Sequence, residues 1–158
     1  MSRKRGKIGR PDIDLAGTGL CAAFNLRRTS RVVTALYDSA LAASDLNSAQ
    51  VAILIAVAKS EPVSIETLAR IILADHSTLS RNLSLLCRAA LLSVSPRSAM
   101  RRKLVCLTPE GTASLARSIR QWRGIQARFV GSFGMRRWVK MQKELEVLAA
   151  IAARLRSR

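Results

Sequence analysis

The stretch SIETLARIILADHSTLSRNLSLLCRAALL, residues 64–92, decides the fold because it predicts two short helices joined by a tight turn. Ser64 is placed to cap the first helix, since its side-chain oxygen can accept a hydrogen bond from the free backbone N–H groups of the first turn. Asp75 is placed to cap the second helix in the same way. Apolar residues recur at helical spacing in both helices, and we expect them to point inward. They are Leu68, Ile71 and Ile72 in the first helix, and Leu79, Leu83, Leu86 and Ala90 in the second.

The other face of the second helix is polar and basic and carries no acid. A short polar and basic face of this kind fits a recognition helix that lies in the major groove of DNA. A surface helix pair with a solvated face would show the same pattern, so both interpretations remain open on this stretch alone. The residues of this face are Ser77, Thr78, Ser80, Arg81, Ser84 and Arg88.

A basic hairpin is predicted directly after the second helix. Residues 91–95 and 102–107 are apolar enough for two short strands, and the segment PRSAMR between them, residues 96–101, is a turn with two arginines. A helix–turn–helix followed by such a hairpin is a winged helix. The sequence therefore predicts a mainly α fold with a small β-hairpin wing.

Four short motifs in register resemble those of the MarR family of winged-helix regulators. The resemblance covers roughly residue 19 to the C-terminus, and both the order and the spacing of the motifs match. They are LNSAQ at 46–50, IETLAR at 65–70, DHSTLSR at 75–81 and LTPEG at 107–111.

This resemblance implies which residues contact DNA. In the major groove we expect the start of the second helix to face bases or phosphates. In the wing we expect arginines to lie along the backbone and in the minor groove, where the negative potential attracts arginine. The expected DNA-binding residues are His76, Ser77, Thr78, Ser80, Arg81 and Ser84 on the helix, and Arg97, Arg101 and Arg102 in the wing.

Two positions depart from the family pattern. The family usually has a glycine after the recognition helix, where this chain has Ala90. The family's wing usually carries an aspartate two residues before its key arginine, and here those positions are Ala99 and Arg101. Loss of the aspartate removes a group that holds the arginine in place, although the wing keeps its positive charge.

Charge and composition limit the function classes. The net charge is +17, from 27 Lys and Arg against 10 Asp and Glu, which points to a polyanionic partner: nucleic acid or an anionic membrane. The longest apolar run, residues 51–58, is too short to span a bilayer, so we expect a cytoplasmic protein with no membrane partner. Three cysteines without CxxC spacing argue against a disulfide scaffold and a zinc site. The sequence shows no paired carboxylates and no Gly-rich phosphate loop, so we expect neither enzymatic activity nor a cofactor.

Three parts are expected along the chain: a basic flexible tail over residues 1–17, a DNA-binding domain over 46–111, and a helical dimerisation region made of 18–45 and 112–158. The homodimer is inferred from a long apolar stripe on the last helix. The alternative is that this stripe folds back on its own chain. The stripe consists of Trp138, Met141, Leu145, Leu148, Ala152 and Leu155.

Helix ends are also readable outside the central stretch. Asn47 and Gln50 have the spacing of a capping box. Thr108 followed by Pro109 marks the start of a later helix. We expect that helix to run to about Arg128, with a break near residues 131–134 before the last helix.

Cys21 is a redox candidate. The segment LCAAF, residues 20–24, resembles the context of a reactive cysteine near the start of the first helix in the organic-hydroperoxide-sensing branch of MarR proteins. The resemblance implies that oxidation of Cys21 acts as the signal. The other interpretation is that Cys21 is a small buried hydrophobe.

The sequence therefore favours a homodimeric, sequence-specific transcriptional regulator, most simply a repressor, that binds a pseudo-palindromic operator in double-stranded DNA. We expect a small organic ligand, bound at the junction of the dimerisation and DNA-binding regions, to release it. Two alternatives remain open: a thiol-based organic-hydroperoxide sensor that uses Cys21, and a basic protein that coats nucleic acid without sequence preference.

Overall fold

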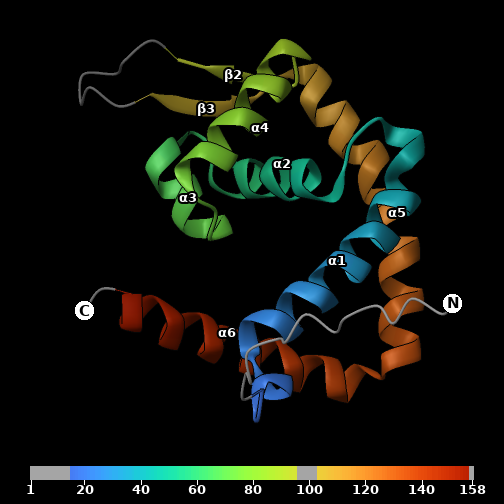
Figure 1. Cartoon of the computed structure of the whole chain (residues 1–158). Coiled ribbons are helices and arrows are strands. Elements are labelled where there is room, and N and C mark those ends of the chain that lie inside the picture. The colour runs from blue at the N-terminus through green and yellow to red at the C-terminus, as the bar shows by residue number, and fades with distance from the viewer. Residues whose placement is uncertain (1–14, 96–102, 157–158) are drawn as a thin grey trace, which may run out of the picture. The chain divides into compact units, whose positions relative to one another are not determined.

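The computed structural model describes residues 15–95 and 103–156 (Figure 1). Of these residues, those up to Thr34 form one compact unit, and those from Ala35 onward form another. The first unit contains the short 3₁₀ helix η1 (Thr18–Leu20) and most of α1 (Ala22–Leu41). The second unit contains η2 (Ala42–Ser44), α2 (Ser48–Ser60), β1 (Val63–Ser64), α3 (Ile65–Ile72), α4 (His76–Arg88), β2 (Leu92–Val94), β3 (Leu104–Leu107), α5 (Pro109–Phe133) and α6 (Met135–Arg156). This architecture confirms the predicted winged helix–turn–helix.

The small sheet has the strand order β1-β3-β2, and both strand pairs are antiparallel. In the predicted hairpin, Leu92 lies opposite Leu107 and Val94 lies opposite Val105. The sequence did not predict β1, whose two residues pair with the other edge of β3. The turn predicted over residues 96–101 lies outside the described residues.

The helix caps are those that the sequence predicted. Asn47 and Gln50 form a complete capping box, in which each side chain accepts a hydrogen bond from the other residue's backbone N–H group. At the other helix starts, one side-chain oxygen accepts a hydrogen bond from the backbone N–H group three residues on. The pairs are Ser64 with Thr67, Asp75 with Thr78, and Thr108 with Gly111. These bonds satisfy donors that a helix start would otherwise leave free, so each helix begins where its cap stands.

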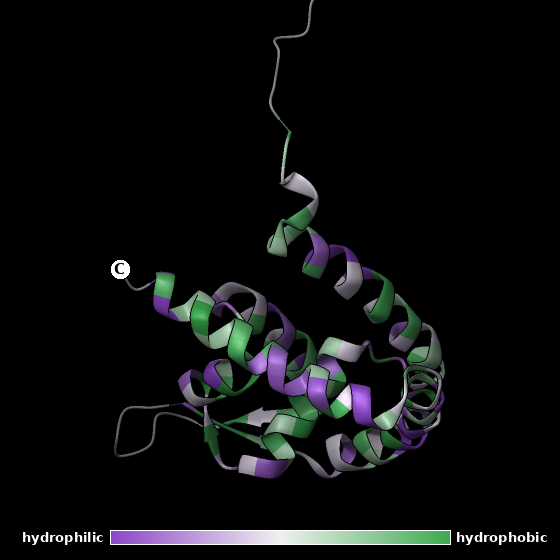
Figure 2. Ribbon diagram, turned by 90° about the horizontal axis from the view of Figure 1, so that it is seen from below, coloured by the Kyte–Doolittle hydropathy of each residue, from purple (hydrophilic) through white to green (hydrophobic). Residues whose placement is uncertain are grey.

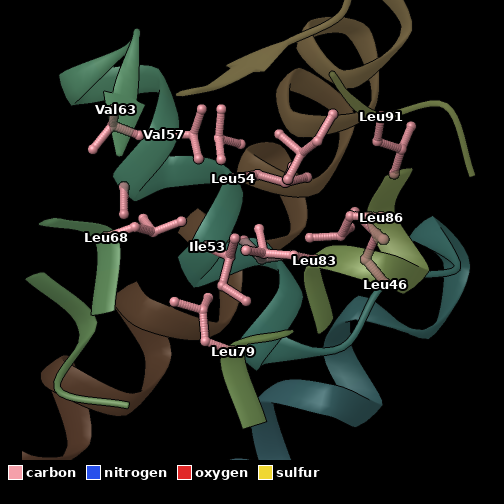
Figure 3. Close-up of a cluster of buried hydrophobic side chains, with 14 of the residues drawn as sticks. Leu46, Ile53, Leu54, Val57, Val63, Leu68, Leu79, Leu83, Leu86 and Leu91 are labelled. Carbon is pink, nitrogen blue, oxygen red and sulfur yellow. The ribbon is translucent and has the colours of Figure 1, made fainter. Parts of the chain in front are cut away.

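One hydrophobic core holds α2, α3, α4 and the sheet together (Figure 3). Helix α2 lies at its centre, with five buried apolar residues. From α4, Leu79, Leu83 and Leu86 enter the same core, each 5% exposed or less. Among the described residues, no single helix is both long and apolar enough to cross a bilayer. Only the consecutive pair Ala22–Ser44 and Ser48–Ser60 reaches that length and composition together.

Two of the apolar residues expected in the core are exposed. Ile71 is 48% exposed, because the face of α3 that packs on the core is formed by Ile65, Leu68 and Ile72. At about 100° per residue, Ile71 lies well to one side of that face. Ala90 is exposed because α4 ends before it.

Ala90 has the left-handed backbone conformation, with φ of 57°. Its N–H group still donates to the carbonyl of Cys87, so it closes the last turn of α4. This conformation costs a residue with a Cβ atom about 1–2 kcal/mol, whereas glycine adopts it freely. The structure therefore gives the physical reason for a glycine at this position in the family.

The break between the last two helices lies at Gly134 alone. Helix α5 continues past Arg128 to Phe133, so Gly131, where the sequence suggested a break, is helical. Gly134 has a φ of 95°, a value that side-chain-bearing residues rarely adopt. Its N–H group donates to the carbonyl of Val130, which ends α5 before α6 begins in a new direction.

The start of α5 is held against the end of the helix–turn–helix. The Thr108 hydroxyl donates to the carbonyl of Ala90 at 2.6 Å, and the Thr108 N–H group donates to the carbonyl of Leu91 at 3.2 Å. Gly111, one turn into α5, packs directly on the same segment. A Cβ atom at Gly111 would lie 1.9 Å from the Leu91 carbonyl oxygen. The glycine of the LTPEG motif is therefore required by a close backbone approach.

We predict that Gly111→Ala destabilises the protein by about 2 kcal/mol or more, because a buried backbone must move to admit the new methyl group. Gly124→Ala is the matched control on the same helix, since a Cβ atom there meets nothing within 4 Å. Alanine should stabilise that position by about 0.5–1 kcal/mol. Urea unfolding at one fixed protein concentration measures both, and equal effects of the two substitutions would contradict the packing argument.

Candidate nucleic-acid interface

The outward side of α4 is set by its buried side. Because successive residues are about 100° apart around a helix, the positions opposite Leu79, Leu83 and Leu86 form one row. Every member of this row is exposed. The row consists of Ser77, Arg81, Ser84 and Arg88, and we call it the outward row.

The remaining helix residues predicted to bind DNA flank this row. His76 is the first residue of α4, and Thr78 and Ser80 lie on either side of the outward row. All three are exposed. The structure thus brings the six predicted α4 residues onto one accessible surface that starts at the helix N-terminus. Within α4 itself the formally charged residues, Arg81 and Arg88, are both basic.

Asp75 adds a fixed negative charge at the start of this surface. Its Oδ1 atom accepts a hydrogen bond from the Ser77 hydroxyl at 2.6 Å and from the Thr78 N–H group at 2.8 Å. These bonds, that from Ser77 first, hold the pKa of the Asp75 carboxyl well below its usual range. The carboxylate is therefore ionised whenever the helix is capped in this way, and a negative charge at a helix N-terminus also interacts favourably with the helix dipole.

The wing lies next to this helix in the fold. Strands β2 and β3 carry the chain toward residues 96–102 and back, and Lys103 at the start of the return is exposed. The predicted contacts of Arg97, Arg101 and Arg102 lie outside the described residues. On β3, the Leu107 N–H group donates to Glu61 Oε2 at 2.7 Å, so a side chain from the end of α2 holds the base of the wing.

An apolar groove of 540 Å³ lies between α5 and α6. Trp122, Val130 and Trp138 contribute to its walls, and its few polar groups come from Arg123, Gln126 and Gln142. Trp122 also packs against the core that holds α4, so the groove borders the winged-helix core. Near Trp138, the ring of Phe129 stacks on the ring of Phe133 and meets the ring of Trp138 edge-on.

Cys21 is exposed and directly precedes α1. Its carbonyl accepts hydrogen bonds from the Asn25 backbone and side chain. Cys87 differs, since burial raises the pKa of its thiol and so disfavours the reactive thiolate. The redox role of Cys21 stays a prediction.

Two side chains at α4 make local hydrogen bonds that the sequence did not predict. Asp75 was assigned only as a cap, yet it also holds the Ser77 hydroxyl. Asn82, on the flank of α4, donates from Nδ2 to the Thr78 carbonyl at 3.0 Å. The spacing of Asp75 and Ser77 was a signal for the first, because an aspartate two residues before a serine often forms a local hydrogen bond.

Comparison with known proteins gives matches to solved structures. The Mycobacterium tuberculosis transcriptional regulator MosR, in complex with DNA, is 33% identical over 85% of this chain and 98% of that chain, with a TM-score of 0.76. PcaV from Streptomyces coelicolor, in complex with its natural ligand, is 22% identical over 90% and 99%, with a TM-score of 0.75. The transcriptional repressor CouR, bound to a DNA duplex, is 20% identical over 90% and 99%, with a TM-score of 0.70. The last two share the fold. No protein-family model and no curated protein sequence matches the chain.

Proposed function

The chain belongs to the MarR family of winged-helix transcriptional regulators, and from that premise we propose that it is a homodimeric repressor that binds a pseudo-palindromic operator in double-stranded DNA. The observation that carries the proposal is the outward row of α4, a polar and basic surface held rigidly opposite the buried leucines. A helix of this kind fits the major groove. We propose that the protein acts in the cytoplasm and has no catalytic role.

In this proposal, Arg81 reads a base and the other predicted residues position the helix. Arginine donates two hydrogen bonds to the O6 and N7 atoms of guanine, the commonest specific contact in the major groove. His76, Thr78 and Ser80 lie toward the phosphates on either side. Arg97, Arg101 and Arg102 supply the wing contacts, and the basic residues of the 1–17 tail add electrostatic attraction without sequence preference.

The dimer is proposed through the first and last helices. Helix α6 has no buried residue in the range Met135–Arg156, and Figure 2 shows apolar segments alternating with polar ones along it. The exposed fractions of Leu145 and Leu148 are 39% and 44%. A helix with such an apolar stripe gains stability by covering it. A second copy of the chain provides a matching stripe through two-fold symmetry.

The signal in this proposal is a small organic ligand in the groove between α5 and α6. The groove volume of 540 Å³ lies within the usual range for small-molecule sites, about 300–1,000 Å³. Trp122 lines the groove and also packs on the core of α4. A ligand that binds one arrangement of α5 more tightly than another shifts the protein toward that arrangement. In the proposed dimer, this shift changes the spacing of the two recognition helices.

The experiment that tests this function is selection of bound fragments from random DNA, at about physiological salt, with the full-length protein. We predict a two-fold symmetric motif whose half-sites are centred about one helical turn apart. Binding with a steep salt dependence and no preferred sequence would instead support a charge-only nucleic-acid-coating protein.

Arg81→Ala should weaken binding to the selected operator more than binding to random DNA. The expected difference is about 1–3 kcal/mol, the value of one bidentate arginine–guanine contact. The control is Arg120→Ala, which removes the same charge from an exposed site on α5 and should change both affinities by similar small amounts. Equal losses on the two DNAs for Arg81→Ala would make this residue a phosphate contact.

The double substitution Leu145→Glu and Leu148→Glu should convert the dimer into a monomer, because it places charges in the proposed interface. The control is Ala150→Glu, which adds a charge on the opposite side of α6 and should leave the dimer intact. Sedimentation velocity at several concentrations measures both. A double variant that sediments as a dimer would disprove the assignment of this stripe to the interface.

A further inference from the structure

The hydroxyl group of Ser77 has its only proton engaged within the protein. Its Oγ atom lies 2.6 Å from Asp75 Oδ1, within the range of about 2.5–2.7 Å for a hydrogen bond from a hydroxyl to a carboxylate. An ionised carboxylate has no proton to donate. The direction of this hydrogen bond is therefore fixed: Ser77 donates and Asp75 accepts.

Asp75 is well suited to keep this direction fixed. The same Oδ1 atom accepts the Thr78 N–H group at 2.8 Å, so the carboxylate is tied to the first turn of α4 and cannot rotate away without uncapping the helix. Its pKa is lowered by these bonds, which keeps the carboxylate ionised at neutral pH. The Ser77 side chain therefore presents only its lone pairs to an outside partner.

Ser77 belongs to the outward row and lies one turn before Arg81. In the major groove, adenine and cytosine present amino groups, which donate hydrogen bonds, whereas guanine and thymine present carbonyl oxygens, which accept them. A hydroxyl free to rotate interacts with either kind of base. A hydroxyl whose proton is already engaged favours the amino group and is repelled by the carbonyl oxygen.

We propose that Ser77 reads an adenine or cytosine as a pure hydrogen-bond acceptor, and that Asp75 is the positioning residue that sets the direction of its hydroxyl. This inference rests on the proposed function, since it requires α4 to lie in the major groove. It assigns to Asp75 a role in sequence preference, beyond that of a helix cap.

Ser84 provides the internal comparison. It lies on the same outward row and is exposed, but within the described part of the chain its hydroxyl has no hydrogen-bond partner. Its proton is free to turn either way. Of these two serines in the outward row, only Ser77 has the built-in direction that favours one class of base.

The test compares base preference in four full-length proteins: wild type, Asp75→Gly, Ser77→Ala and Ser84→Ala. Glycine is an accepted helix N-cap residue that costs little stability there, so Asp75→Gly should nearly keep the wild-type melting temperature. It has no side-chain oxygen to accept the Ser77 proton, which releases the Ser77 hydroxyl from its single direction. Each protein is used to select DNA from a random library, and affinities are then measured on duplexes that differ at one position.

In wild type, we expect one position per half-site at which A or C on one strand is favoured over G or T by about tenfold, a modest value for one mismatched base pair. Ser77→Ala and Asp75→Gly should both reduce this preference to within about twofold. Ser84→Ala should retain the tenfold preference at that position. Loss of preference in Asp75→Gly, where the serine and the fold both remain, is an effect that a purely structural cap would not produce.

Three results would overturn the inference. They are an unchanged preference in Asp75→Gly, an unchanged preference in Ser77→Ala, and a wild-type preference for G or T at the position that Ser77 controls. If wild type selects a two-fold motif and one of these results follows, the inference fails and the proposed function stands. If wild type selects no motif at all, both fail together.

Discussion

The burial of three leucines on one side of α4 is the constraint on which the interface depends. Leu79, Leu83 and Leu86 enter the core around α2, and the helical period then determines which residues face outward. Turning α4 about its axis would expose these side chains, at a cost of about 1.5–3 kcal/mol for each. The direction of Arg81 is thus a consequence of packing on the opposite side of the helix. The caps at Asp75 and at Ala90 define where this rigid element begins and ends.

A second contact ties this element to the long helix α5. Thr108 bonds to the carbonyls of both Ala90 and Leu91, and Gly111 lies against the same segment. The Thr108 hydroxyl links the two segments directly, because it donates to the carbonyl of Ala90 and also accepts a hydrogen bond from the Gly111 N–H group. Any shift of the start of α5 must therefore move the end of α4. Under the proposed function, this connection carries a change in α5 to the recognition helix.

Much of the fold could be predicted from the sequence because its signals are local. A cap such as Asn47 with Gln50, or Thr108 before Pro109, acts within a single turn, and the core row of α4 repeats at a fixed spacing. The features that were missed or wrongly predicted depend on contacts between residues far apart in the sequence. Strand β1 has only two residues and exists through its pairing with β3. Ile71 has helical spacing from Leu68, but the side of α3 that packs on the core carries Ile65 and Ile72 instead.

The candidate site was predicted in its residues but not in its internal bonds. The six α4 positions share one surface, as their spacing implied, whereas the bond between Asp75 and Ser77 needed coordinates to establish its length and direction. The role of Gly111 was also inaccessible, because its close contact lies twenty residues back in the chain, at Leu91. The wing arginines lie outside the described residues, so their roles stand as predictions.

In the proposed complex, the outward row of α4 enters the major groove of DNA. The most direct measurement is protection of guanine N7 atoms from methylation on a bound operator, since N7 lies in the major groove. We predict two clusters of protected guanines, related by two-fold symmetry and about one helical turn apart. A stable complex in which every guanine N7 remains as reactive as in free DNA would contradict it.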